Sequence, residues 1–262
     1  MNGSGKRVAL ITGSTGGLGL ATAAALAAAG HDVVLHGLLP ADEGGRLAAD
    51  LSETYAVSTL YVRADLADTA GVEQLVHTAA AHFGGIDILV NNAVTRHFSP
   101  VEDFPPEAWD RGLAVNLSAP FHAIRLSLPH MRAQDWGRII NFASVYSFFA
   151  TPNRIDYVTA KTALLGLTRT VALEVAGTGI SCNAICPGTL PTPDIEARIA
   201  RMAAERGQNV ETATRDYLAT RQPSGRFISL DTVAGLVNFL CGPATTDING
   251  AALPVDAGWT AA

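Results

Sequence analysis

The chain has 262 residues, 48% of them hydrophobic and 16% charged, which is enough apolar sequence to bury a large core. A net charge of −6 and basic residues that form no block argue against nucleic acid or an anionic membrane surface as a partner. The first residues lead straight into a strand-like run rather than a signal peptide, and no apolar segment approaches ~20 residues, so we expect a cytoplasmic protein that does not span a membrane.

A glycine-rich turn follows the first apolar run. Residues 8–11, Val-Ala-Leu-Ile, have the form of a strand buried on both faces, and residues 21–29 are rich in alanine, the best helix former. Between them, Gly13 permits a tight turn, Gly17 lets a pyrophosphate approach backbone N–H groups, and Gly19 allows close helix packing. Many glycine turns merely reverse the chain, but one between a strand and a helix predicts nucleotide binding.

The ends of the second and third strands bear on the choice of nucleotide. The second strand is expected over residues 32–36 and the third over residues 59–62. NAD usually meets an acidic residue at the end of the second strand, and NADP a basic one. The tip here, residues 36–38, reads His-Gly-Leu without Lys or Arg, so we favour NAD over NADP. Asp65, after the third strand, either caps the next helix or accepts a hydrogen bond from an adenine amino group.

A buried amide is expected in the middle of the chain. A helix over residues 69–83 and a fourth strand over residues 86–90 precede Asn-Asn-Ala at 91–93, and a long helical region over residues 106–131 then carries Asn116 among apolar neighbours. An amide left there without partners costs about 1–3 kcal/mol. Asn116 therefore either bonds to the backbone or holds a water in a proton path.

A hydroxyl, a phenol and an ammonium are spaced for proton transfer. The fifth strand, residues 138–142, delivers Ser144 at its carboxyl end, where open parallel sheets bind ligands. Tyr157 and Lys161 begin a helix that runs to about residue 175, and positions i and i+4 share one helix face. Lys161 would lower the Tyr157 pKa toward neutrality, as a general acid or base requires. Alone, such a pair also occurs by chance on many helix surfaces.

The remaining elements complete an alternating pattern. After a sixth strand over residues 180–185, a polar stretch over residues 189–221 is helical in its middle, which is typical of a substrate lid. A helix over residues 230–240 and a closing strand over residues 252–256 follow. The alternation predicts one α/β domain over residues 1–262, a doubly wound parallel sheet of Rossmann type with helices on both faces.

The three cysteines, Cys182, Cys186 and Cys241, lie in apolar surroundings. An odd number of apolar thiols suits a reducing compartment better than disulfides or a metal site. We therefore expect no metal cofactor.

Together these motifs resemble the classical short-chain dehydrogenase/reductase family over essentially the whole chain. They are Thr12-Gly-x-x-x-Gly17-x-Gly19, Asn91-Asn-Ala93, Asn116, Ser144, Tyr157-x-x-x-Lys161 and Pro187-Gly188, in the family's order and spacing. The resemblance implies hydride transfer between a nicotinamide and an alcohol/carbonyl pair. Ser144 would orient the substrate oxygen, and Tyr157 would exchange its proton. Lys161 would lower the Tyr157 pKa and bond the nicotinamide ribose, while Asn116 would anchor a relay water.

Within the family the chain looks similar to D-3-hydroxybutyrate dehydrogenases, for example at Val-Glu-Asp-Phe-Pro from residue 101 and Val-Asp-Ala-Gly-Trp-Thr from residue 255. Those enzymes use NAD and are usually tetramers, so the resemblance implies NAD, with NADP as the alternative, a small-molecule substrate and a homotetramer. We expect the cofactor to contact Gly13, Ser14, Thr15, Gly17, Leu18, Gly19, Asp65, Leu66, Asn92, Ala93, Tyr157, Lys161, Pro187, Gly188 and Thr192.

The expected substrate pocket departs from that pattern. The differences are Val94 for Gly, Arg96 for Gln, Tyr146 for His, Arg154 for Lys, Thr189 for Trp and Arg198 for Gln. Arginine binds carboxylate, sulfonate or phosphate through two fixed bonds, which Lys and Gln do not match. Arg154 and Arg198 also fall where the family's 2-hydroxypropyl-coenzyme M dehydrogenases look to hold a sulfonate. We therefore expect Arg96, Ser144, Tyr146, Arg154, Tyr157 and Arg198 to contact a small anionic substrate, unless the arginines are solvated or subunit-contact residues.

Two other functions stay open at this point. One is a dehydrogenase or reductase for neutral ketones or sugar alcohols. The other is a dinucleotide-sensing protein without turnover, although a sensor has no need of Asn116, Ser144, Tyr157 and Lys161 together.

Overall fold

The computed structural model describes residues 6–261, which form a seven-stranded parallel sheet in the order β3-β2-β1-β4-β5-β6-β7. Residues 1–5, on which the expectation about a signal peptide rests, and residue 262 lie outside the described residues. The strand order changes direction at β1, which lies between β2 and β4, and ligands bind at such a point in open α/β sheets. The strands are β1 Val8–Ile11, β2 Asp32–Gly37, β3 Thr59–Arg63, β4 Ile88–Asn91, β5 Gly137–Phe142, β6 Ile180–Pro187 and β7 Ala252–Val255.

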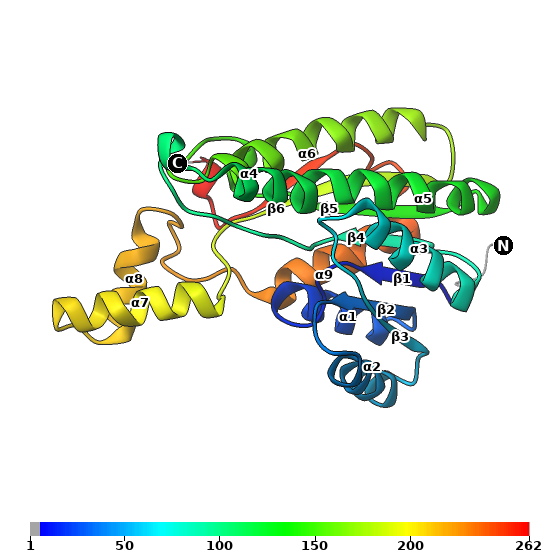
Figure 1. Cartoon of the computed structure of the whole chain (residues 1–262), viewed down its shortest axis with the longest axis horizontal. Coiled ribbons are helices and arrows are strands. Elements are labelled where there is room, and N and C mark those ends of the chain that lie inside the picture. The colour runs from blue at the N-terminus through cyan, green and yellow to red at the C-terminus, as the bar shows by residue number, and fades with distance from the viewer. Residues whose placement is uncertain (1–5, 262) are drawn as a thin grey trace.

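Helices cover both faces of the sheet (Figure 1). The side chains of β1 show why: Leu10 packs in one core with α3, α5 and α6, while Ala9 and Ile11 pack in the other with α1, α2 and α9. Alternate residues of a strand point to opposite faces, so a strand buried on both sides is apolar throughout. The helices are α1 Gly17–Ala28, α2 Ala41–Tyr55, α3 Thr69–Phe83, α4 Pro106–Leu113, α5 Ala119–Gln134, α6 Ile155–Glu174, α7 Pro193–Arg206, α8 Val210–Ala219 and α9 Leu230–Cys241. The predicted single Rossmann-type α/β domain is confirmed.

The region expected as one long helix over residues 106–131 is interrupted. A π-helical turn, Ala114–Ser118, separates α4 from α5. Pro120 has no N–H to donate to the carbonyl of Asn116 four residues earlier, so the α-helical bonding pattern cannot continue there. Turns of this kind often occur at functional sites.

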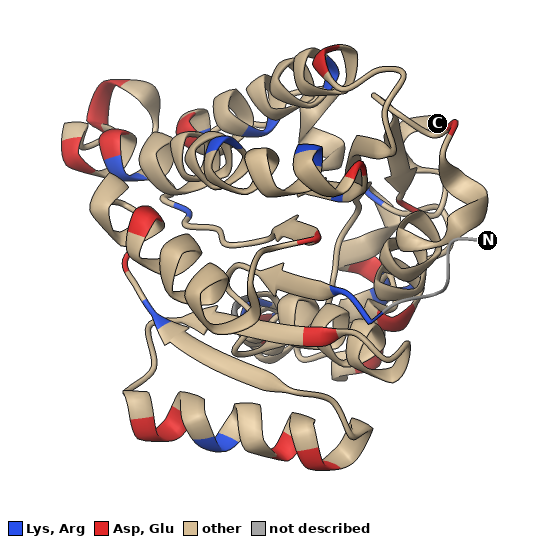
Figure 2. Cartoon of the chain, turned by 90° about the vertical axis from the view of Figure 1, so that its right-hand side faces the viewer, with Lys and Arg blue, Asp and Glu red and all other residues tan. Residues whose placement is uncertain are grey.

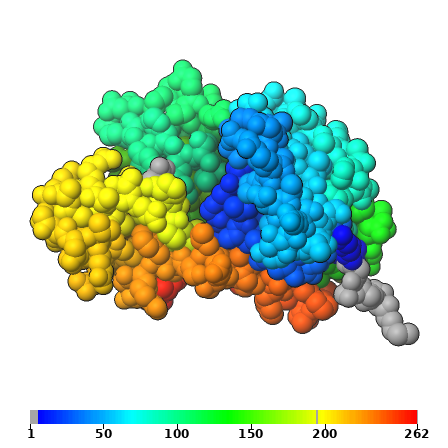
Figure 3. Space-filling model, turned by 90° about the horizontal axis from the view of Figure 1, so that it is seen from below, coloured from blue at the N-terminus to red at the C-terminus, as the bar shows by residue number. Residues whose placement is uncertain are grey.

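The stretch expected as a substrate lid contains two helices, α7 and α8. They pack on each other around Ile199, Ala203 and Ala213 and project to one side of the sheet (Figure 1). In Figure 3 α7 and α8 (yellow) lie beside the green segment near residue 100, apart from the blue N-terminal elements.

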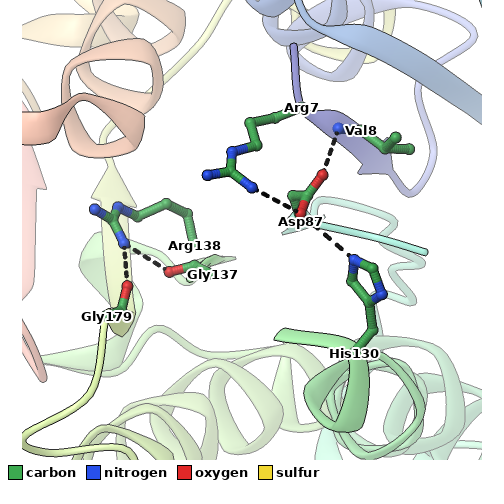
Figure 4. A network of polar contacts seen from close by, with 7 residues as sticks. All are labelled: Arg7, Val8, Asp87, His130, Gly137, Arg138 and Gly179. Carbon is green, nitrogen blue, oxygen red and sulfur yellow. Dashed lines mark hydrogen bonds and ion pairs between the residues drawn. The ribbon is translucent and has the colours of Figure 1, made fainter. Parts of the chain in front are cut away.

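Charged side chains at the amino ends of the strands contact one another or backbone groups (Figure 4). Asp87 accepts hydrogen bonds from the Val8 N–H at 2.9 Å and the Arg7 guanidinium at 3.5 Å, and its other neighbour is the His130 ring at 3.5 Å. Arg138, which is buried, donates to the carbonyls of Gly137 and Gly179, each at 2.8 Å. Elsewhere acidic and basic residues are interspersed along the outer helices (Figure 2). No helix within residues 6–261 is long and apolar enough to cross a membrane.

Candidate active site

A cavity of about 830 Å³ opens at the carboxyl ends of the strands. Its walls come from the turn after β1, the tips of β2 and β3, the segment after β4, the ends of β5 and β6, and α7. Residues more than a hundred positions apart, such as Gly13 and Tyr157, therefore line one space. This is the edge at which the sequence predicted a ligand site.

The turn after β1 is shaped to hold a phosphate. Gly13 has a φ of +62° and passes so close to Ala93 that an added Cβ would lie 2.8 Å from the Ala93 Cα. Gly16 and Gly17 face open space, and the N-terminus of α1 has no side-chain cap, so its backbone N–H groups are available to an anion. Gly19 has no room for a side chain because the Gly13 carbonyl lies against it. These residues fit the pyrophosphate of a dinucleotide.

Asn92, predicted to contact the cofactor, also holds this turn in place. Its amide nitrogen donates to the carbonyls of Thr12 at 2.9 Å and Gly13 at 2.8 Å. The Thr12 hydroxyl in turn accepts from the Asn92 and Ala93 N–H groups at 2.9 and 3.0 Å. The turn and the end of β4 thus form one rigid unit.

His36 is buried beneath the turn. In the sequence it was noted only as a residue that is neither acidic nor basic. Its Nδ1 accepts from the Gly13 N–H at 2.9 Å, and its Nε2 lies 3.0 Å from the Ala64 carbonyl. These partners require the neutral ring with its proton on Nε2. Burial lowers the pKa of His36, which favours the same neutral form.

The tip of β2 reaches the cavity through Gly37 and Leu38. Thr15 lies against Gly37, where an added Cβ would meet the Thr15 methyl at 2.6 Å, so no larger residue fits without a shift. Leu38 is 56% exposed and presents an apolar side chain at the position that discriminates between nucleotides.

Asp65 lines the cavity but is engaged by protein groups. The Arg111 guanidinium of α4 donates to both of its oxygens at 3.2 Å, and the Ala67 N–H donates at 3.0 Å. The Ala67 N–H and the Arg111 guanidinium lower the pKa of Asp65. The contact to an adenine amino group stays a prediction.

Ser144, Tyr157 and Lys161 meet at the end of β5, as the sequence predicted from their positions. All three are buried. The Lys161 ammonium donates to the Phe142 carbonyl at 2.6 Å and lies 5.8 Å from the centre of the Tyr157 ring. Burial by itself would raise the pKa of Tyr157, but the cations of Arg96 and Lys161 and the Ser144 hydroxyl outweigh it and lower that pKa. Burial lowers the pKa of Lys161 to about 8, even though Tyr157 opposes that change.

Asn116 is fully buried at the π-helical turn. Its side-chain oxygen accepts from the Thr95 N–H, and its side-chain nitrogen donates to the Thr95 carbonyl, both at 2.9 Å. Of the two interpretations offered by the sequence, the structure shows the bonding to backbone. A relay water held by Asn116 stays a prediction.

Three arginines surround the mouth of the site. The Arg96 guanidinium lies 5.2 Å from the centre of the Tyr157 ring, and those of Arg154 and Arg198 lie 4.3 and 5.3 Å from the centre of the Phe98 ring. None of the three forms an ion pair with any carboxylate side chain that the structure describes. Burial lowers the pKa of Arg154. An unpaired, partly desolvated guanidinium is costly unless an anion joins it.

Aromatic rings lie on the side of the cavity that is expected to hold the substrate. Tyr146 lies in edge-to-face contact with Tyr157, Phe149 and Trp259, at centroid distances of 5.5 to 6.4 Å. Phe149 and Trp259 also contact each other. The sequence did not assign Phe98 or Trp259 to the site, because Phe98 lies within no motif and Trp259 was noted only as part of the carboxyl-terminal resemblance; both reach the site through the fold.

Most of the residues expected to contact the cofactor line the cavity. They are Gly13, Thr15, Leu18, Gly19, Asp65, Leu66, Asn92, Ala93, Tyr157, Lys161, Pro187, Gly188 and Thr192. Ser14 and Gly17 are not among the lining residues. The buried Ser14 hydroxyl donates to the Ile11 carbonyl and accepts from the His36 N–H beneath the turn, and Gly17 begins α1 with a φ of +52°. Val94 and Thr189 line the cavity as well, and Val94 is 39% exposed.

Comparisons with known proteins agree with this geometry. The family model described as short chain dehydrogenase matches residues 7–203. The chain is 42% identical to D-beta-hydroxybutyrate dehydrogenase of Cupriavidus necator, covering 97% of this chain and 98% of the relative. It is 39% identical to 2-(R)-hydroxypropyl-CoM dehydrogenase of Xanthobacter autotrophicus, covering 97% and 99%.

A solved structure adds the fold in three dimensions. L-Sorbose reductase from Gluconobacter frateurii, complexed with NADPH and L-sorbose, superposes with a TM-score of 0.93 at 32% identity, covering 98% of this chain and 97% of that one. With the family model, the full-length relatives and the Ser144–Tyr157–Lys161 arrangement in agreement, this chain belongs to the short-chain dehydrogenase family and is an oxidoreductase.

Proposed function

We propose that the protein interconverts a secondary alcohol and a ketone on a small anionic molecule, one that carries a carboxylate or a sulfonate, with NAD as the cofactor. The observation that carries this proposal is the group formed by Arg96, Arg154 and Arg198, which line the cavity next to Tyr157 or Phe98 without a carboxylate partner among the described side chains. An anionic substrate would supply that partner through charge-assisted hydrogen bonds.

The proton chemistry follows from the three buried side chains at the end of β5. In the oxidation direction, the Tyr157 phenolate accepts the hydroxyl proton, and the Ser144 hydroxyl orients the substrate oxygen. Lys161 and Arg96 keep the phenolate accessible by lowering the Tyr157 pKa. Bound nicotinamide would accept the hydride. In the reverse direction the neutral phenol donates its proton to the oxyanion that forms on the carbonyl.

NAD, rather than NADP, is supported by the tip of β2. A 2′-phosphate is favoured by a nearby cation, and the lining residues at that tip are His36, Gly37 and Leu38. His36 is neutral and uses both ring nitrogens within the protein. Leu38→Arg should therefore lower KM for NADP severalfold while KM for NAD changes little. An unmodified protein that already prefers NADP would overturn the choice of cofactor.

Two similar proteins are named for substrates that carry an acidic group, and other similar structures are named for neutral sugars or sugar alcohols. The two relatives described above are named for D-beta-hydroxybutyrate and for 2-(R)-hydroxypropyl-CoM. The reductase of solved structure is named for L-sorbose, and another similar structure is an NAD⁺-bound xylitol dehydrogenase. A neutral ketone or sugar alcohol is therefore the alternative that the experiment must separate.

The test is a substrate panel assayed by NADH absorbance with NAD and NADP. It should contain 3-hydroxybutyrate, hydroxyalkyl sulfonates, and neutral alcohols of matched size. We expect acidic alcohols to react with higher kcat/KM, and Arg154→Ala and Arg198→Ala each to lower that value by about 10–100-fold, because each removes a hydrogen bond to a charged group.

Arg169→Ala is the matched control, since Arg169 is exposed on α6 and lies outside the cavity. If both cavity variants leave acidic substrates unaffected while neutral ketones react equally well, the anionic substrate is refuted. Tight NADH binding without turnover on the whole panel would instead favour a dinucleotide sensor.

Assembly and location are also proposals. We infer a homotetramer in the cytoplasm, supported by the sequence resemblance stated above. Sedimentation velocity of the purified protein tests the tetramer directly.

A further inference from the structure

His36, near the end of β2, is joined to the turn after β1 by three hydrogen bonds. The Gly13 N–H donates to His36 Nδ1 at 2.9 Å. The Ser14 N–H donates to the His36 carbonyl at 2.8 Å, and the His36 N–H donates to the Ser14 hydroxyl at 3.0 Å. The last two bonds use backbone atoms of His36, so a substitution there can preserve them. The bond to Gly13 uses the ring, so it depends on which side chain is present.

The bond to the ring fixes the peptide group between Thr12 and Gly13. The carbonyl of this peptide accepts from the Asn92 side chain at 2.9 Å, and its N–H donates to His36. Gly13 has a φ of +62°, and glycine adopts many backbone conformations about equally well. Its own geometry therefore does not select this shape. Partners on both sides of the peptide hold the turn so that the N-terminus of α1 stays open to an anion.

The other ring nitrogen of His36 contacts the end of β3. Nε2 lies 3.0 Å from the Ala64 carbonyl, and Ala64, Asp65 and Leu66 all line the cavity. A carbonyl only accepts and a backbone N–H only donates, so the two partners fix the proton on Nε2. One buried ring thus connects the turn expected to hold the pyrophosphate with the segment expected to hold the adenine.

We propose that His36 is a positioning residue for the cofactor: its neutral ring holds the turn after β1 in place for the pyrophosphate, and a proton on Nδ1 releases that turn. A charged ring donates from both nitrogens, so Nδ1–H would face the Gly13 N–H, donor against donor. Affinity for a dinucleotide should then fall. This role concerns binding alone and does not depend on the proposed anionic substrate.

The surroundings of His36 set the pH range of the effect. Burial lowers its pKa below the ordinary 6.5, although the Ala64 carbonyl and the Asp65 charge oppose that change. The turn after β1 carries no charged side chain, and Asp65 is paired with Arg111 of α4. The pKa of Asp65 is itself lowered, so its charge stays constant while His36 titrates. The neutral ring is the binding form, so affinity is complete above the His36 pKa and falls as the pH drops through it.

The probe is ADP-ribose, which carries the adenine and the pyrophosphate but no nicotinamide. Tyr157 and Lys161 are expected to contact the nicotinamide end, so the Lys161 pKa of about 8 should not enter the profile. Calorimetry of the full-length protein from about pH 5 to about pH 8 measures the Kd. The Kd should be constant near neutral pH and should rise below about pH 6.5, approaching tenfold per pH unit once the ring is charged.

Two substitutions of His36 separate its two ring contacts. His36→Asn places an oxygen where Nδ1 lies, so Gly13 keeps an acceptor that does not titrate. His36→Gln retains a donor for the Ala64 carbonyl but offers the Gly13 N–H no acceptor. The asparagine variant should keep most of the affinity and lose the acid rise, whereas the glutamine variant should bind ADP-ribose about tenfold more weakly at neutral pH. His77→Asn, an exposed change on α3 outside the cavity, is the matched control and should show the unmodified profile.

The ring can also be observed without a ligand. Nitrogen-15 NMR of the free protein should show Nδ1 unprotonated and Nε2 protonated at neutral pH. The opposite tautomer would contradict the role of His36, because Gly13 would then have no acceptor.

The binding data decide the remaining outcomes. An acid rise of equal size in His36→Asn and the unmodified protein would overturn the proposal. So would equal affinity of the asparagine and glutamine variants at neutral pH, even if both melt at a lower temperature, since the ring would then be only structural. If the unmodified profile is flat to pH ~5, the two variants at neutral pH decide. If His36→Gln does not fold, the two pH profiles decide, and the tautomer decides if those profiles are also flat.

Discussion

The two edges of the sheet hold arginines in opposite circumstances. At the amino edge, Arg138 is buried and gives hydrogen bonds to two carbonyls, while Arg7 meets Asp87 (Figure 4). The guanidinium groups of Arg7 and Arg138 also lie over the Trp136 ring, 4.2 and 4.6 Å from its centre, respectively. At the carboxyl edge, Arg96, Arg154 and Arg198 have aromatic neighbours and no described carboxylate partner.

We interpret this difference as one between groups that stabilise the fold and groups that, as proposed, bind an anionic substrate. A guanidinium that donates to backbone carbonyls, as Arg138 does, contributes to stability, and its removal leaves those carbonyls without that donor. A guanidinium that has stacking contacts but no counter-charge contributes little to stability, so its contribution must appear on binding. Substitutions at the amino edge should therefore lower the free energy of unfolding, whereas substitutions at the carboxyl edge should change the enzyme kinetics.

The largest effect is expected at the carboxyl edge. Tyr157→Phe removes the hydroxyl that we propose exchanges the proton, so kcat should fall by about 10²–10⁴-fold. The urea midpoint should change little. Tyr55→Phe, on α2 away from the cavity, is the matched control, and near-normal turnover by Tyr157→Phe would show that another group transfers the proton.

The counterpart at the amino edge is Arg138→Leu. It leaves the carbonyls of Gly137 and Gly179 without that donor, so the free energy of unfolding should fall by about 1–3 kcal/mol. Equilibrium unfolding in urea measures the loss, and kcat/KM of the folded protein should stay unchanged. Arg154→Ala should show the reverse pattern. Loss of activity without loss of stability in Arg138→Leu would contradict the separation of the two edges.

A smaller effect concerns pH. In the proposed reaction the phenolate of Tyr157 is the base for alcohol oxidation, so kcat/KM should rise with pH through its lowered pKa and level off above it. Of the two cations, Arg96 lowers the Tyr157 pKa more. Arg96→Leu should therefore raise that pKa, and the acid limb of the pH profile should move to higher pH. A limb that stays in place would mean that Lys161 alone sets the Tyr157 pKa.

The smallest effect is expected for Arg7→Ala. Its contact with Asp87 is long, at 3.5 Å, and the side chain is 26% exposed, so the loss should be about 1 kcal/mol or less. The difference from the unmodified protein should shrink further in ~1 M salt. A larger, salt-independent loss would place Arg7 with Arg138 as a structural cation.

The sequence predicted the parts of the fold and site that depend on local pattern. The first strand, Val8–Ile11, has the predicted bounds, and the glycine turn and the Ser144–Tyr157–Lys161 group meet at the predicted edge. Periodicity, glycine placement and i, i+4 spacing are properties of short stretches, and parallel sheets bring strand ends together.

What the sequence could not predict depends on partners far along the chain. Asp65 could be assigned to a helix cap or to adenine, but its pairing with Arg111, 46 residues later, needed the fold. His36 was read as lacking a charge for the ribose, whereas its position under Gly13 is set by the packing of β2 against the turn. The long helical region hid its interruption because Pro120 is also acceptable in the first turn of a new helix.

The π-helical turn at Ala114–Ser118 makes this part of the site intolerant of changes in length. An extra residue is accommodated in this wide turn, so deleting one residue there would remove the turn itself and shift its remaining residues, Asn116 included, around the helix axis. Asn116 would then point away from Thr95, and the segment that follows β4 would lose these two hydrogen bonds. Substitutions in this turn should have effects that vary with the side chain. A deletion should instead leave the residues expected to bind the cofactor in place and displace those expected to contact the substrate beside Tyr157.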